Sequence, residues 1–227
     1  MKKISCFAFF LFVSVVVYAQ EIKKAAPEPF PESRIYFKGS YQLFRRLARL
    51  DPSIQEAGLR NLADEFRSGG TLSLEAGVRV CTHQYIGLTH SRYTQSGSFR
   101  MTRQVQSLTL GALTMWDEAQ LEERIAYTGL NYNYLIPLSA AQRAFFTTKA
   151  GVGLWGYNAT SEAFNANNEI KKTGLGYQLG LGFEVRLTKN VSWVADVELL
   201  TGGVEIEEDE RENLSQLRAG TGLALRF

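Results

Sequence analysis

The chain is poor in the residues that most often carry disulfides, metal sites and catalysis. Its 227 residues include two cysteines, Cys6 and Cys81, and two histidines. Cys6 lies within an N-terminal segment that we expect to be removed, so Cys81 would stand alone in the mature chain. That excludes an intramolecular disulfide. Cys6 also precedes most of the apolar run instead of ending it, which argues against a lipid-modified N-terminus.

The chain also lacks a net charge that would suggest a partner. The formal charge of +2 falls to about zero once Lys2 and Lys3 are removed with the N-terminal segment. A basic patch or stripe is the usual footprint of nucleic-acid binding. We therefore expect no nucleic-acid partner.

Long hydrophobic runs are absent beyond the N-terminus. The run from Phe7 to Tyr18 follows two lysines and ends at Ala19. This order is typical of a cleaved signal peptide, predicted over residues 1–20. A leader over residues 21–34 follows, with Pro27, Pro29 and Pro31 among charged residues. No later stretch approaches the roughly 18 apolar residues of a spanning helix, so a membrane location would require a β-barrel.

The sequence does contain segments in which apolar and polar residues alternate. In the last stretch, Leu217, Leu223, Leu225 and Phe227 share one face of a strand, and the other face is polar or small. A transmembrane β-strand shows lipid-facing and lumen-facing residues in this order. Comparable segments recur to make eight in all over residues 35–227: Ile35–Phe44, Gly69–Cys81, Tyr85–Tyr93, Arg124–Pro137, Ala144–Tyr157, Lys172–Leu187, Val191–Gly202 and Leu214–Phe227.

The connections between these segments alternate between long and short. The long ones are expected to be loops at Arg45–Ser68 (with a short amphipathic helix), Phe99–Glu123, Asn158–Ile170 and Gly203–Asn213. The base of the Phe99–Glu123 loop can also extend the flanking strands as a hairpin. Outer-membrane barrels sort their connections into short periplasmic turns and long external loops. The predicted fold is therefore all-β: an antiparallel up-and-down transmembrane β-barrel of eight strands. A ten-stranded barrel with an extra hairpin in Phe99–Glu123 stays open.

The ordered series of segments resembles the outer-membrane protein β-barrel domain family, the small eight-stranded barrels of the OmpA/OmpX type. The resemblance rests on Arg67–Gly77, Tyr127–Tyr132, Lys149–Tyr157, Gly176–Asn190 and the terminal Phe227. It implies location in the cell outer membrane, contact with outer-membrane lipid, and assembly by the barrel-assembly machinery. It also implies that Phe227 in the C-terminal strand acts as the assembly signal. The resemblance names no cofactor and no ligand for the external loops.

Charged residues occupy the predicted inner face. We call this set the lumen charge network: Lys38, Glu75, Arg79, Lys149, Glu184, Arg186, Asp196, Glu198, Arg218 and Arg226. Charges in a narrow bore are tolerated when they are paired, so the set predicts salt bridges that plug the lumen, with Glu184 and Arg186 paired to neighbours such as Arg218 and Asp196. That favours a non-enzymatic scaffold serving envelope integrity, adhesion or partner binding. The alternative is a small porin or transporter for ions or small solutes.

Catalysis and metal binding are disfavoured by the spacing of the candidate residues. The enzymes known on small outer-membrane barrels, lipid A deacylases and palmitoyl transferases, need a histidine near a serine and a carboxylate. His83 lies in a predicted periplasmic turn, and His90 and Ser91 are neighbours in a strand, so they point to opposite faces. The acidic run from Glu205 to Glu212 lacks the ligand spacing of a calcium loop. We expect no enzyme activity, no metal site and no cofactor.

Overall fold

The structure, a computed structural model, describes residues 33–47, 61, 64–107, 111–139, 141–163, 166–207 and 210–227. The predicted signal peptide and nearly all of the proline-rich leader lie outside the described residues, as does most of the helix predicted in Arg45–Ser68. In this described part of the chain, no helix is long and apolar enough to cross a membrane.

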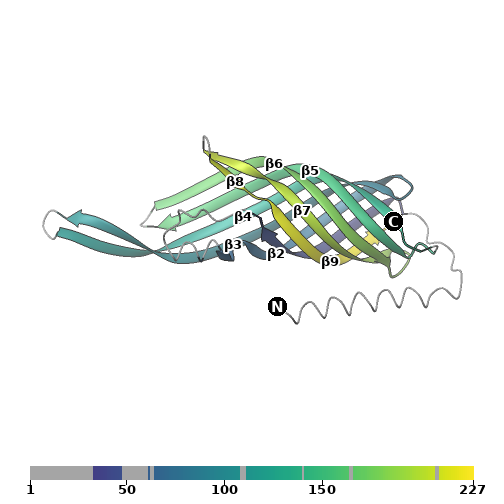
Figure 1. Ribbon diagram of the computed structural model, residues 1–227, viewed down its shortest axis with the longest axis horizontal. Coiled ribbons are helices and arrows are strands. Elements are labelled where there is room, and N and C mark those ends of the chain that lie inside the picture. The colour runs from purple at the N-terminus through teal and green to yellow at the C-terminus, as the bar shows by residue number, and fades with distance from the viewer. Residues whose placement is uncertain are drawn as a thin grey trace.

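Eight antiparallel strands close into one barrel (Figure 1). They are β1 (Ile35–Arg46), β2 (Ser68–Cys81), β3 (Gln84–Ser107), β4 (Gly111–Pro137), β5 (Ala144–Ala163), β6 (Ala166–Arg186), β7 (Val191–Glu207) and β9 (Gln216–Arg226). The short β8 (Glu210–Asn213) pairs with the outer part of β7 and stands outside the ring. β9 closes the barrel against β1, from Tyr36↔Arg226 to Arg46↔Gln216. The predicted eight-stranded up-and-down barrel is confirmed.

Phe99–Glu123, the region in which an extra hairpin would have made a ten-stranded barrel, instead continues strands β3 and β4. These strands pair without a register shift from Gln84↔Tyr134 to Ser107↔Gly111. They contain 24 and 27 residues, against 12 in β1, and their outer ends project well beyond the rest of the barrel (Figure 1). The ten-stranded alternative is therefore wrong, since the extra residues lengthen two existing strands.

Two other predicted loops are also paired strands. β5 and β6 stay in register out to Ala163↔Ala166, so most of Asn158–Ile170 is hairpin. Most of Gly203–Asn213 forms the β7–β8 pair. Ladder hydrogen bonds do not require an alternating sequence. Beyond the membrane no lipid imposes one, so the strands continue where the pattern stops.

The short connections gather at the end of the barrel that holds the C-terminus (Figure 1). The β2–β3 turn has two residues, Thr82 and His83, between the paired Cys81 and Gln84. His83 adopts a φ of 61°, the left-handed conformation that such tight hairpin turns use. The sequence predicted both a tight turn here and its position at the end of the barrel with the short connections.

The outer wall is apolar and the inner wall is polar or aromatic. Leucines from many strands point outward and stay about three-fifths exposed, for example Leu43 at 64%, Leu88 at 61% and Leu175 at 61%. Side chains of the opposite parity, such as Gln42 and Gln178, are buried. A continuous exposed apolar belt around a closed barrel is the surface that contacts lipid.

Candidate functional site

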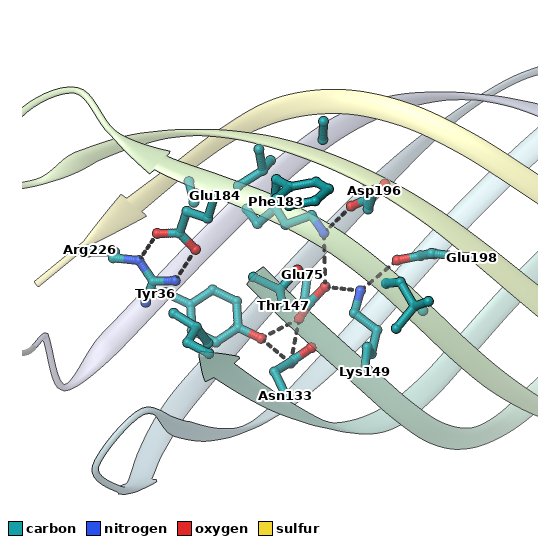
Figure 2. A pocket seen from close by; sticks show the side chains of 17 residues that line it. Tyr36, Glu75, Asn133, Thr147, Lys149, Phe183, Glu184, Asp196, Glu198 and Arg226 are labelled. Carbon is teal, nitrogen blue, oxygen red and sulfur yellow. Dashed lines mark hydrogen bonds and ion pairs between the residues drawn. The ribbon is translucent and has the colours of Figure 1, made fainter. Parts of the chain in front are cut away.

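The centre of the lumen holds a cluster of opposite charges drawn from four strands (Figure 2). Lys149 of β5 places its Nζ 2.5 Å from Glu75 Oε2 of β2 and 2.7 Å from Glu198 Oε1 of β7. Lys38 of β1 binds Asp196 of β7 and lies 3.8 Å from Glu75 Oε2. These five side chains cross-link opposite walls of the barrel.

Neutral side chains complete the hydrogen bonding of the cluster. Tyr36 donates its hydroxyl hydrogen to Glu75. Asn133 Nδ2 donates to Glu75 Oε1 at 2.8 Å and to the Tyr36 hydroxyl at 2.7 Å. Gln178 Nε2 donates to Glu198 Oε2 at 3.0 Å. Because buried charges are stable only when paired and hydrogen-bonded, these contacts stabilise the Glu75 and Glu198 carboxylates in the bore.

A separate pair lies nearer the C-terminal end of the barrel. Arg226 of β9 donates two parallel hydrogen bonds to Glu184 of β6, from Nε to Oε1 at 2.6 Å and from Nη2 to Oε2 at 2.5 Å. The Arg226 guanidinium also lies over the rings of Tyr36 and Tyr85, at 5.4 and 5.1 Å from their centroids. The planar, bidentate geometry is the strongest form of such a pair.

Glycines on the inner face make room for these long side chains. A Cβ built on Gly180 would lie 3.3 Å from both Glu198 Cγ and Lys149 Cβ. At Gly176 it would lie 2.5 Å from Trp155 Nε1. A larger residue at Gly176 would therefore displace the tryptophan.

The space that remains in the centre is small. The cavity beside the charge cluster has a volume of about 40 Å³ and is lined by Lys38, Glu75, Lys149, Asp196 and Glu198, among others (Figure 2). One water needs roughly 10–15 Å³ by the same measure, so the cavity has room for a few waters.

The outer half of the lumen is filled by apolar and aromatic side chains. They form a buried cluster that we call the outer plug: Phe44, Tyr93, Ile125, Tyr127, Trp155, Leu200, Val204 and Leu214. Arg218 lies at its inner side, where Nη1 donates to Ser91 Oγ at 2.7 Å and Nε donates to Gln216 Oε1 at 3.0 Å. Sequence reasoning missed the outer plug, although Trp155 has the same inward parity as Lys149.

A second charge cluster, also missed, lies at the outer mouth. Arg46 Nη1 donates to both carboxylate oxygens of Glu123, at 3.0 and 2.9 Å, and Nη2 binds Glu212. Glu212 belongs to Gly203–Asn213, a segment expected from the sequence to be a loop. Arg46 continues the inward parity of Lys38 and Gln42, and this signal could have identified it.

The members of the predicted lumen charge network occupy several distinct sites. Lys38, Glu75, Lys149, Asp196 and Glu198 meet in the centre, and Glu184 meets Arg226. Glu184 pairs with Arg226, so its predicted pairing with a neighbour such as Arg218 is wrong.

The remaining members lie apart from that centre. Arg186 is buried, with its guanidinium 4.8 Å from the centroid of the Phe145 ring. Arg79 is half-buried near the end of β2, where its backbone N–H donates to the carbonyl of Arg34 at 2.8 Å. Arg218 contacts Ser91 and Gln216, so it belongs to the base of the outer plug.

His90 and Ser91, neighbours in β3, point to opposite faces of the barrel wall. His90 is exposed on the outer wall, with its Nδ1 2.8 Å from Thr128 Oγ1. Ser91 is buried and accepts from Arg218. The histidine and its neighbouring serine therefore cannot act together.

Phe227, the predicted assembly signal, is exposed at 61% on the outer wall. Its ring meets that of Phe37 edge to face, with 6.5 Å between centroids. Its carbonyl accepts hydrogen bonds from the N–H groups of Arg34 and Ile35, at 2.6 and 3.0 Å. The terminal residue thus lies at the seam where β9 joins β1.

We predict that deleting Phe227, or replacing it with aspartate, lowers the amount of barrel assembled in the outer membrane. The reason is that the exposed ring contributes little to packing, so its main role would be recognition during assembly. The measurement is heat-modifiable gel mobility of the membrane fraction. Phe37→Ala, which removes the same ring contact and keeps the terminal aromatic, is the matched control. Assembly of the Phe227 variants at the level of Phe37→Ala would contradict the prediction.

Comparison with known proteins identifies the fold through structure and not through sequence. No protein-family model matches the chain, and no curated protein matches it. The crystal structure of Neisserial surface protein A matches with a TM-score of 0.50 and 13% identity, over 85% of this chain and 97% of that one. At this identity the likeness establishes the fold alone.

Two further solved structures align over similar lengths. Ail, the attachment invasion locus protein of Yersinia pestis in complex with the heparin analogue sucrose octasulfate, has a TM-score of 0.45 and 13% identity, over 86% of this chain and 97% of that one. The outer membrane protein OprG from Pseudomonas aeruginosa has a TM-score of 0.43 and 14% identity, over 88% and 98%.

Proposed function

We propose that this protein, an integral β-barrel of the outer membrane, is a non-enzymatic scaffold with a closed lumen that displays β structure outside the cell. Its fold is that of small outer-membrane barrels, and its belt of exposed leucines matches the lipid-facing surface such a fold needs. The function of the protein would then be to present its external strands to partners, and not to conduct solutes through the lumen.

The observation that carries the closed lumen is the outer plug. Trp155, Tyr127 and Ile125 are fully buried across the bore, and Leu200 and Leu214 close on them from β7 and the β8–β9 connection. Hydrated ions need a continuous polar path, and this buried, largely apolar layer interrupts it. The central ion pairs add a second barrier below this layer.

The displayed structure with the greatest reach is the β3–β4 hairpin. β2 follows β3 as far as the pair Leu72↔Arg92, and β5 follows β4 as far as Gln120↔Glu162. Among the described strands, none pairs with the outer edges beyond these points. Unpaired strand edges can bind an extended segment of another protein by adding a strand. This favours partner binding or adhesion among the scaffold roles.

The non-catalytic part of the proposal rests on the placement of His90. Its only close polar contact given by the described residues is Thr128, on the outer wall, and Ser91 points into the lumen. Acyl-transfer chemistry requires a nucleophile and base within hydrogen-bond reach.

The closed lumen is tested by conductance in planar lipid bilayers. We expect no steady channels from the wild-type protein, while a porin reconstituted in the same way conducts. Glu184→Gln, which removes one partner of the Arg226 pair, should lower stability and admit small ions intermittently. Steady wild-type channels whose ion selectivity changes in Glu184→Gln without a loss of stability would instead establish a small porin.

A further inference from the structure

The belt of exposed leucines is interrupted on the wall formed by β3 to β6. In one register row, His90 and Thr128 lie between Leu74 of β2 and Leu154 of β5. The His90 ring and the Thr128 hydroxyl contact each other at 2.8 Å. A polar pair thus occupies outward positions that the flanking strands fill with leucine.

The next row outward has one cation, Arg92, followed by the small residues Ala126 and Gly156, which we call the small floor. Arg92 pairs with Ala126, which pairs with Gly156, which pairs with Thr173. A Cβ built on Gly156 would have no heavy atom within 4 Å, apart from its chain neighbours. The wall is therefore shallow and open beside Arg92.

The following row outward borders the small floor and consists of polar and charged side chains. Arg124, Asn158 and Lys171 follow one another across β4, β5 and β6. The side chains of Arg124 and Lys171 are 49% and 67% exposed. Glu122 and Glu169 contact these two cations at 2.6 and 2.7 Å. Both glutamates belong to the next row out, so they hold the cations from the side away from the floor.

We propose that this patch binds the phosphate of an outer-leaflet lipid headgroup. Arg92 and Arg124 are diagonal neighbours on adjacent strands, about 7–8 Å apart, and Lys171 lies two strands, about 10 Å, from Arg124. Their long side chains can therefore reach a phosphorylated headgroup that lies over the small residues between them. Arginine and lysine are the usual phosphate ligands. The small floor would admit the headgroup, and Leu154 and Leu175 just inside it would contact the acyl chains.

The depth and direction of the patch select a lipid as the occupant. On β3, β4 and β6 the outward series runs from the exposed Leu88, Leu130 and Leu175 to Arg92, Arg124 and Lys171, so each cation lies where the apolar belt ends on its strand. That level is where the headgroups of surrounding lipids lie. The inference rests on the membrane placement of the barrel and is independent of the closed lumen, so a conducting wild-type protein would leave it standing.

The test uses purified barrel in uncharged maltoside micelles, with bisphosphorylated lipid A as the probe and native mass spectrometry as the readout. We expect the wild type to retain one lipid, and the triple variant Arg92→Gln, Arg124→Gln, Lys171→Gln to bind at least about tenfold more weakly, because each charge-assisted contact is strong. Arg45→Gln is the matched control. Arg45 is an exposed cation at the outer end of β1, in register with Leu217 of β9 and Ser68 of β2, and away from the β3–β6 patch.

Gly156→Leu is the second variant, since it fills the floor and leaves every charge in place. It should also weaken lipid binding, and heat-modifiable mobility will show that each variant is folded. Lipid A without phosphates should bind the wild type as weakly as the triple variant binds the phosphorylated form. Millimolar inorganic phosphate should not displace the lipid.

Three results would overturn the proposal. The first is equal binding by the wild type, the triple variant and Gly156→Leu. The second is an equal loss in Arg45→Gln, which would mean diffuse attraction to the whole rim. The third is displacement of the lipid by inorganic phosphate, which would mean a site for a free anion.

Discussion

Replacing Lys149 with glutamine is expected to lower the free energy of unfolding by about 3–5 kcal/mol, the range for breaking a buried ion pair. Lys149 is the one cation within 4.0 Å of both Glu75 and Glu198 among the described residues. Its loss leaves Glu198 with no cation within that distance among the described residues, and Glu75 with Lys38 alone, at 3.8 Å, in a bore with room for only a few waters. The measurement is denaturant unfolding of the barrel in phospholipid vesicles.

Two variants separate the ion pairs from a general effect of losing a lysine. Lys149→Gln combined with Glu198→Gln removes one of the stranded charges and should recover part of the lost stability, as coupled neighbours do. Lys189→Gln changes an exposed lysine in the β6–β7 turn and should leave stability unchanged. A Lys149→Gln protein that unfolds at the wild-type denaturant concentration would show that the central cluster does not stabilise the barrel.

Leu179→Arg is expected to destabilise the barrel by about 2–4 kcal/mol, the cost of an arginine at the bilayer midplane on the lipid face. Leu179 is 58% exposed and lies in the middle of the outward series of β6, between Ala150 and Leu199 of the adjoining strands. Because its surroundings are lipid and not water, the new charge would be removed from its solvent.

Ser96→Arg is the matched control for this prediction. Ser96 is exposed in the projecting part of β3, opposite Glu122 of β4, where an arginine meets water and a carboxylate. It should change the free energy of unfolding very little when both variants are measured in the same vesicles. Equal tolerance at the two positions would mean that the leucine belt does not face lipid.

The division between inner and outer walls could be predicted because it depends on one local property. Successive side chains of a strand point to opposite faces, so parity alone places Leu179 outside and Gln178 inside. The burial of these residues follows the predicted parity, as it does for Lys38 and Phe37. The number of strands followed in the same way, since each stretch of alternation is one crossing of the membrane.

The extent of the strands outside the membrane could not be predicted from the same signal. Phe99–Glu123 breaks the alternation, and we expected a loop of which only the base could extend the flanking strands, but β3 and β4 remain paired as far as Ser107↔Gly111. Alternation reports a boundary between lipid and lumen. Above the membrane that boundary is absent, while the backbone hydrogen bonds that hold a hairpin together remain available.

Sequence parity placed the charges of the lumen on the inner wall but did not reveal which of them meet. Glu184 contacts Arg226, and Lys149 of β5 reaches Glu75 of β2, although neither pair lies on adjacent strands. Such contacts depend on how far each strand is tilted and staggered when the sheet closes, because tilt and stagger decide which levels of opposite walls face each other. The same closure brings Trp155 and Leu200 together in the outer plug. Which face of the sheet a side chain points to is decided within each strand. Which side chains pair across the lumen is decided only when the barrel closes.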